Sequence, residues 1–326
     1  MTSARAFALA CAADAAFGDP ADFPHPVRAL GALCGQAERL ARAYARGDAR
    51  RERAAGAVLC ATFVGGTYAI AAVALARARR IDARFGVACE IGLAWTTLAA
   101  RDLLAEAHAV ISALESCDLP RARTRVARIV GRDTAQLAPV DISRATIETL
   151  AESACDGIVA PLLALAVGGV PLALAFKAAS TLDSMLGHIE APYTHLGSVS
   201  ARFDDVACFV PARVAALALA LCAPVVGGDA SRALAVLRAD GHRHRSPNAG
   251  RPEAAMAGAL GVRLGGTNYY DGVAHVAPFL GARFAEPTVA AARSARTLVA
   301  TSACAVATLA IAIHALGSGL KRNRQA

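Results

Sequence analysis

Reactive polar side chains interrupt an otherwise apolar sequence between residues 151 and 211. Glu152 and Asp156 are four residues apart, so on a helix they share one face, and Lys177 and Thr181 repeat that spacing. The same stretch also contains Ser184, His188, Arg202, Asp204 and Asp205. Such groups are costly to bury unless they pair, bind a metal or hold a charged ligand, so we predict a site here. The alternative is that these charges mark only the solvated ends of helices.

The combination of residue types indicates phosphate chemistry. Carboxylates with serine, threonine and lysine suit Mg²⁺ bound to phosphates, because hard oxygens hold the cation while cationic side chains neutralise the remaining charge. A second predicted anion site is the loop 240–253, where Ser246 and Asn248 precede a helix expected over 253–266. An ordinary surface loop is the alternative there. The common nucleotide-binding, hydrolase and zinc motifs GxxxxGK(S/T), GxSxG and HExxH are absent.

The composition indicates a membrane protein. Of the 326 residues, 56% are hydrophobic and 18% are charged, and the mean hydropathy is +0.42. An alanine-rich soluble helical protein is the alternative, because alanine favours close helix packing more than insertion. The net charge of +8 favours anionic lipids or anionic substrates, and without a basic stripe of interleaved aromatics we expect no nucleic acid partner. The nine cysteines lack a CxxC spacing and are interpreted as reduced core residues.

These patterns predict an all-α, polytopic membrane protein with about four to six apolar helices, polar helical loops and a single domain over residues 1–326. A short apolar helix over 4–17 and a basic amphipathic helix over 28–53, typical of an anionic membrane surface, come first. Gly169 and Pro171 predict a broken or re-entrant helix, because irregular backbone is tolerated at membrane depth where it lines a cavity. The candidate spans are 54–76, 157–176, 209–228 and 297–317.

Several long motifs occur in a fixed order: GDPADFPHPVRALG, RDLLAEA, IVGRDTAQL, AESACDGIVAP, FKAASTLDSMLGH, GSVSARFDDVACFVPAR and HRSPNAGRPEAAMAGALGVRLGG. In this combination the chain resembles the adenosylcobinamide-phosphate synthase family of cobalamin biosynthesis, from about Asp14 to Gly272. Ser180 and Cys208 depart from the family's motifs, which have asparagines at these positions. A lost amide alters a hydrogen bond to ligand, whereas neither change removes a charge.

The resemblance implies an integral, multi-pass enzyme of the inner cell membrane. Such ligases join the free propionate carboxylate of adenosylcobyric acid to the amine of (R)-1-amino-2-propanol phosphate, giving adenosylcobinamide phosphate with consumption of ATP and Mg²⁺. The corrinoid acid and the amino-alcohol phosphate are then substrates, and the lipid bilayer and other membrane enzymes of late cobalamin assembly are the expected partners. An acyl phosphate formed first and then attacked by the amine is a chemically coherent step order.

Roles for single residues follow from this chemistry. The expected Mg²⁺ ligands are Asp156, Asp204 and Asp205, with Asp183 as a fourth. The side chains expected to neutralise phosphate charge are Lys177, Arg202 and Arg213. Glu152 or His188 would take the proton from the attacking amine. Further substrate or phosphate contacts are expected from His25, Arg28, His244, Ser246, Asn248 and Glu253. All are expected to meet in one pocket at the lipid boundary.

Two other classes of protein are open at this point. A polytopic transporter for an organic anion would use the intramembrane charges as its path, and it would show flux across sealed vesicles without product formation. A membrane assembly scaffold would hold other enzymes together and would tolerate single carboxylate substitutions.

Overall fold

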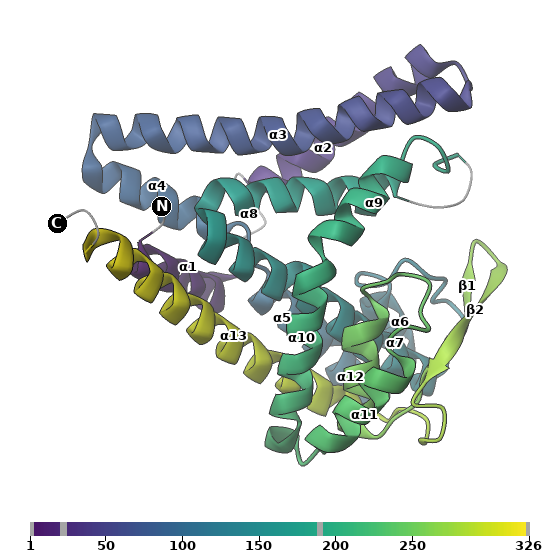
Figure 1. Ribbon diagram of the computed structural model, residues 1–326. Coiled ribbons are helices and arrows are strands. Elements are labelled where there is room, and N and C mark those ends of the chain that lie inside the picture. The colour runs from purple at the N-terminus through teal and green to yellow at the C-terminus, as the bar shows by residue number, and fades with distance from the viewer. Residues whose placement is uncertain (1–2, 20–24, 188–191, 324–326) are drawn as a thin grey trace. The chain divides into compact units, whose positions relative to one another are not determined.

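A computed structural model describes residues 3–19, 25–187 and 192–323 (Figure 1). The chain divides into two compact units, each assembled from separate stretches of sequence. Unit 1 comprises Met1–Ala99, Ala160–Cys208 and Ala307–Ala326, and unit 2 comprises Ala100–Val159 and Phe209–Val306. Each unit is described by itself below. The single domain over residues 1–326 stays a prediction.

Unit 1 is built from helices that pack around a small apolar core. Cys34, Leu59, Cys60, Leu182 and Leu186 form this core, and they come from three helices that lie side by side. The helices of unit 1 are α1 (Ala4–Phe17), α2 (Pro26–Ala45), α3 (Ala49–Ile81), α4 (Ala83–Trp95), α8 (Ala160–Leu186) and α9 (Ser198–Ala207), with the last part of α13 (Val289–Asn323). The amino-terminal helix over 4–17 is therefore confirmed.

The basic segment 28–53 is two helices, so the prediction of one amphipathic helix is wrong in its extent. α2 ends at Ala45, and Gly47 adopts a φ of 78°, which lies in the left-handed region that favours glycine. Asp48 then caps α3, because its carboxylate accepts hydrogen bonds from the N–H groups of Arg50 and Arg51. The local turn and cap explain the interruption.

The predicted break in the second apolar stretch is confirmed within α8. Gly169 has φ 67° and ψ −163°, and Pro171 follows inside the helix (Figure 1). A proline has no N–H to donate, and a non-helical residue disturbs the preceding turn, so carbonyls just before the break lose helical partners. His314 Nδ1 donates a hydrogen bond to the carbonyl oxygen of Ala166 at 2.8 Å, which compensates one of them.

Replacing Gly169 with alanine is expected to destabilise the protein. The φ and ψ of Gly169 lie in a region that only glycine occupies readily, so a Cβ there costs about 1–3 kcal/mol. Thermal unfolding of the detergent-solubilised protein measures the loss. Gly65→Ala is the matched control, because Gly65 lies inside α3 with nothing near its position for a Cβ, and there alanine is expected to be neutral or stabilising. Equal melting temperatures for the two variants would contradict the assignment of a glycine-dependent break.

The apolar core of unit 2 is formed by three helices within residues 100–153. Val110, Ala122, Val126, Ile142 and Ala145 belong to this core. Its elements are α5 (Ala100–Glu115), α6 (Leu119–Val126), α7 (Pro139–Ser153), the π-helix η1 (Ala154–Val159), α10 (Phe209–Cys222), the 3₁₀ turn η2 (Ala223–Val226), α11 (Ala230–Asp240), α12 (Gly250–Leu260), β1 (Leu264–Tyr270), β2 (Val273–Leu280) and the first part of α13.

An antiparallel hairpin of β1 and β2 in unit 2 was not predicted. The helix expected over 253–266 ends at Leu260, because Gly261 adopts the left-handed conformation that closes a helix. Asp271 and Gly272 form the two-residue turn, with φ of 48° and 77°. An Asp-Gly pair between alternating residues is a strong hairpin signal, so the sequence contained the information.

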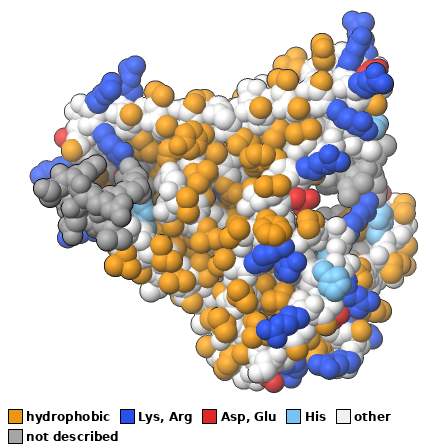
Figure 2. All heavy atoms as spheres, viewed as in Figure 1, with side chains coloured by type: hydrophobic (Ala, Val, Ile, Leu, Met, Phe, Trp, Pro, Cys, Tyr) orange, Lys and Arg blue, Asp and Glu red, His pale blue; other side chains and the backbone are white. Residues whose placement is uncertain are grey.

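Within the described residues, four helical segments are long and apolar enough to cross a membrane: Ala49–Ile81, Pro139–Leu186, Phe209–Val226 and Val289–Gly317. Large apolar side chains on these segments are exposed, for example Ile70 at 72% and Leu316 at 70%. Figure 2 shows hydrophobic side chains over much of the visible helical surface. Exposed apolar surface of this kind suits a lipid environment. The predicted class, an all-α polytopic membrane protein, is confirmed.

Candidate functional site

In unit 1, α8 and α9 bring together four of the predicted site residues. Lys177 and Asp183 lie on α8 after the break, and Asp204 and Asp205 lie on α9, which packs against α8. Asp204 interacts electrostatically with the other three. We call these residues the α8/α9 cluster. It contains three carboxylates and one lysine, so its net charge is negative when all four are ionised, which favours a cation.

The carboxyl of Asp204 has the most unusual environment in the α8/α9 cluster. Burial raises its pKa to about 6, and the nearby Asp183 carboxylate acts in the same direction. Its Oδ2 accepts a hydrogen bond from Cys208 Sγ at 3.4 Å, which lowers the pKa. The charge of Asp205 raises the pKa by a smaller amount, and that of Lys177 lowers it. Its Oδ1 is buried without a hydrogen-bond partner among the described residues. A buried carboxylate oxygen without a donor is available to a cation.

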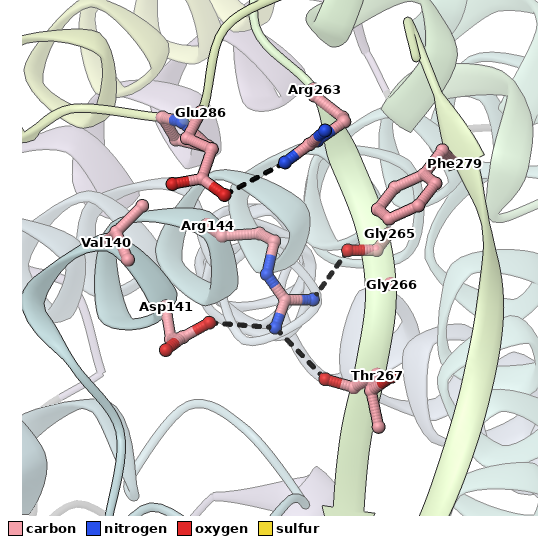
Figure 3. A pocket seen from close by; sticks show the side chains of 10 residues that line it. Val140, Asp141, Arg144, Arg263, Gly265, Gly266, Thr267, Phe279 and Glu286 are labelled. Atoms are coloured by element: carbon pink, nitrogen blue, oxygen red, sulfur yellow. Dashed lines mark hydrogen bonds and ion pairs between the residues drawn. The ribbon is translucent and has the colours of Figure 1, made fainter.

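In unit 2, a buried network of charges joins α7 to the hairpin. The Glu148 carboxylate is 5% exposed, and it accepts hydrogen bonds from Arg132 Nη2 at 2.7 Å and from the Gly265 N–H at 2.8 Å. Arg144, one turn earlier on α7, donates to the carbonyls of Gly265 and Thr267 (Figure 3). Both arginines also donate to Asn268 Oδ1. Side chains therefore form hydrogen bonds with backbone groups of Gly265 and Thr267 at the outer edge of β1, where the described residues provide no neighbouring strand.

Glu253 extends this network toward the predicted phosphate loop. It is 6% exposed, and burial raises the pKa of its carboxyl well above the usual range. The neighbouring carboxylates of Glu148 and Glu152 raise it further, while Arg132 lowers it. All but one of these influences favour the protonated form of the Glu253 carboxyl. Of these residues, Glu152 at the end of α7 is exposed.

The predicted phosphate loop lies before α12, as expected, and part of it caps the helix. Ser246 Oγ accepts hydrogen bonds from the N–H groups of Asn248 and Ala249, each at 3.3 Å. His244 Nδ1 accepts from the Ser246 N–H at 3.1 Å, and burial lowers the pKa of this imidazole. The neutral ring therefore carries its proton on Nε2. Two of the amides expected to face a phosphate are already paired with Ser246, so its hydroxyl has a capping role.

The remaining predicted residues have the following surroundings. His25 precedes α2 and pairs with Asp19 at 3.2 Å, whereas Arg28 is exposed on α2. Arg202 is exposed on α9. Arg213 lies over the Phe209 ring on α10. Asp156 lies in the π-helix η1 of unit 2, a kind of distortion that is frequent at functional sites. His188 lies outside the described residues. That residues of both units share one pocket stays a prediction.

The sequence interpretation missed four residues of the unit 2 network. The predicted site residues do not include Arg132, Arg144, Glu148 or Asn268, although Arg144 and Glu148 have the i, i+4 spacing of a helical ion pair. Pairing with Asn268 depends on the hairpin, which was not predicted, so this contact could not be inferred. The i, i+4 spacing was the available signal.

The apolar helical segments define an integral membrane protein of the all-α class. The family described as CobD/Cbib protein matches residues 7–299. The chain is 44% identical over 276 residues to "Cobalamin biosynthesis protein CobD" of Klebsiella pneumoniae subsp. pneumoniae, covering 85% of this chain and 86% of the relative. It is 45% identical over 282 residues to the protein of the same description from Geobacter metallireducens, covering 86% and 87%.

A third relative, "Cobalamin biosynthesis protein CbiB" of Salmonella typhimurium, is 44% identical over 276 residues, with 85% of this chain and 86% of the relative covered. The chain therefore belongs to the CobD/Cbib family. The family resemblance inferred from the motifs is thereby confirmed. No solved structure matches the chain.

Proposed function

We propose that this protein is an ATP-dependent amide-forming ligase of cobalamin biosynthesis in the inner cell membrane. Its substrates would be adenosylcobyric acid and (R)-1-amino-2-propanol phosphate, and its product adenosylcobinamide phosphate. The family membership supports the pathway, and the four apolar segments support the membrane location. Other membrane enzymes of late cobalamin assembly are the partners we propose.

The observation that carries the proposal is the α8/α9 cluster. Its carboxylates fit Mg²⁺, because they offer hard oxygens and because Asp204 Oδ1 is buried without a donor in the described part of the chain. We assign Asp183, Asp204 and Asp205 as ligands, with Asp156 as a further ligand. These carboxylates would hold Mg²⁺, which would supply positive charge next to the phosphates of ATP. Lys177, Arg202 and Arg213 would take the remaining phosphate charge.

The reaction that these groups support has two steps. The propionate carboxylate of the corrinoid attacks the terminal phosphorus of ATP with ADP as leaving group, which gives an acyl phosphate. The amine then attacks the acyl carbon, so that a C–N bond forms while the C–O bond to phosphate breaks and inorganic phosphate leaves. The proton lost by the amine would pass to Glu152 or His188. Glu152 is exposed at the end of α7, which leaves its carboxylate accessible to a substrate.

The loop before α12 would contribute to phosphate binding. His244 Nε2–H would donate to an anion at the start of the helix, and Ser246 and Asn248 would shape the loop through the cap. Glu253 would act as a hydrogen-bond donor in its protonated form, which its raised pKa favours. His25 and Arg28 would close the site from the amino-terminal side.

Mass spectrometry tests the proposed function directly. The purified protein in detergent is expected to convert adenosylcobyric acid, the amino-alcohol phosphate and ATP with Mg²⁺ into the amide, with one ADP and one phosphate per product. Omitting ATP or Mg²⁺ is the control and is expected to give none. Substrate flux into sealed vesicles without any amide would favour the transporter instead. Absence of both, with unimpaired carboxylate variants in cells, would favour the scaffold.

A further inference from the structure

A small pocket in unit 2 lies outside all of the predicted site residues. It opens between the first turn of α7, the edge of β1 and the segment just before α13 (Figure 3). Its volume is about 240 Å³, and Asp141, Arg144, Arg263, Thr267, Phe279 and Glu286 line it. Ligand sites commonly have volumes of about 300–1,000 Å³, so this pocket suits only a small molecule.

One wall of the pocket is rigid. The Arg144 side chain is 10% exposed, and its guanidinium is fixed by the carbonyls of Gly265 and Thr267 and by Asp141 at 3.4 Å. Gly266 forms the adjoining wall and packs closely against Phe279, because a Cβ at this residue would lie 3.0 Å from the Phe279 ring. The pocket is therefore formed by packed residues and is not a gap between mobile loops.

The ion pair on the opposite wall can be replaced by contacts with a ligand. Arg263 pairs with Glu286 at 2.9 Å, and their side chains are 33% and 63% exposed. Exposed ion pairs contribute little to stability, so ligand groups can replace them at low cost. The guanidinium of Arg263 also lies over the Phe279 ring, at 4.8 Å from the ring centre. That ring face is therefore already covered, which argues against stacking of a nucleobase on it.

The charges of the pocket select the class of ligand. Two arginines and two carboxylates leave it without net charge. A simple anion would be repelled by Asp141 and Glu286, a simple cation would be repelled by the arginines, and an apolar molecule would desolvate all four groups. A short ligand that carries one cationic and one anionic group can pair with both signs at once.

We propose that this pocket binds a small zwitterion, with its ammonium group on the carboxylates of Asp141 and Glu286 and its anionic group on Arg263. The assignment of that zwitterion as the amino-alcohol phosphate substrate rests on the proposed function, whereas the class of ligand does not. The large corrinoid and ATP would bind elsewhere, since neither fits the volume.

Titration calorimetry of the full-length protein in detergent tests this assignment without ATP, Mg²⁺ or corrinoid. The probe is (R)-1-amino-2-propanol phosphate. Arg263→Gln and Glu286→Gln are each expected to weaken its binding at least about tenfold, because each removes one charge partner. Arg283→Gln is the matched control, since Arg283 is exposed nearby but does not line the pocket, and its binding is expected to equal that of the unaltered protein. 1-Amino-2-propanol and inorganic phosphate are each expected to bind at least about tenfold more weakly than the probe.

Unchanged binding of the probe by both pocket variants would overturn the proposal, as would equally tight binding of inorganic phosphate alone. The outcome is separable from the proposed function. Amide formation together with unchanged binding in both variants would remove the pocket and keep the ligase. Binding that depends on Arg263 and Glu286, in a protein that forms no amide, would keep the zwitterion site and remove the ligase.

Discussion

Asp204→Asn is expected to abolish amide formation while the protein still inserts into the membrane. Asparagine keeps the shape of the side chain but offers Mg²⁺ a neutral oxygen, and Oδ1 of Asp204 is buried without a donor among the described residues. Loss of a metal ligand or of its charge typically costs at least about 100-fold in rate. The rate of amide formation measured by mass spectrometry gives the effect. Normal turnover in this variant would exclude Asp204 as an essential ligand.

The control for this variant is a carboxylate in the same unit that has an ordinary partner. Glu38 pairs with Arg42 across one turn of α2, so Glu38→Gln removes one carboxylate from unit 1 without touching the α8/α9 cluster. Its turnover is expected to stay within about twofold of the unaltered protein, because this half-buried pair takes no part in the α8/α9 cluster. A similar loss in both variants would indicate a general effect on the protein.

The same substitution is expected to stabilise the metal-free protein at high pH. The pKa of Asp204 rises from 3.8 to about 6 on folding, so its contribution to stability is fully present below about pH 4 and is lost as the pH rises through about 6. Asparagine does not ionise and avoids this loss. With EDTA present, Asp204→Asn is expected to melt at a higher temperature than the unaltered protein at pH 8, and at the same temperature at pH 4. Equal melting temperatures at both pH values would contradict the raised pKa.

These opposite effects on activity and stability distinguish a functional carboxylate from a structural one. A residue that only holds the fold should lose stability when its charge is removed, as expected for Glu148. Asp204 is instead destabilising when ionised and unliganded, and a bound cation would compensate for that cost. Strained electrostatics of this kind are frequent at functional sites.

The membrane character and the helix break were predictable because each depends on local sequence. Twenty or so apolar residues specify a span wherever they pack, and a Gly-Gly-Val-Pro sequence disrupts a helix regardless of its neighbours. The α8/α9 cluster was predictable in part, since Lys177 and Asp183 lie on one helix and Asp204 follows closely in the chain. The family motifs pointed to the same residues.

The unit 2 network was not predictable in the same way. Glu148 bonds to Gly265, which is 117 residues later in the chain, and Arg132 bonds to Asn268, which is 136 residues later. Contacts at such separations depend on how the hairpin packs against α7. The periodicity of apolar residues in the sequence does not predict that packing. The Asp-Gly turn was a local signal that predicts the hairpin. It does not predict that the hairpin contacts Arg144 and Glu148.

Glu148→Ala is expected to cause the largest loss of stability among the variants considered. The substitution removes one acceptor from Arg132 Nη2 and one from the Gly265 N–H, and it leaves Arg144 without a carboxylate at 3.5 Å. These groups are buried, so removing one partner of the network should cost about 3–5 kcal/mol. Thermal unfolding in detergent measures the loss, and proteolysis within the hairpin at residues 269–276 reports its detachment from α7.

Glu106→Ala is the matched control for Glu148→Ala, because Glu106 pairs with Arg128 in the same unit, at 2.6 Å, but at the surface. The Arg128 side chain is 59% exposed, so water replaces the lost partner and the cost should stay below about 1 kcal/mol. The difference between the two variants isolates the effect of burial from that of losing an ion pair. If Glu148→Ala unfolds no earlier than Glu106→Ala, the network does not hold the hairpin on α7. The wall of the zwitterion pocket that Arg144 and β1 form would then lack its support.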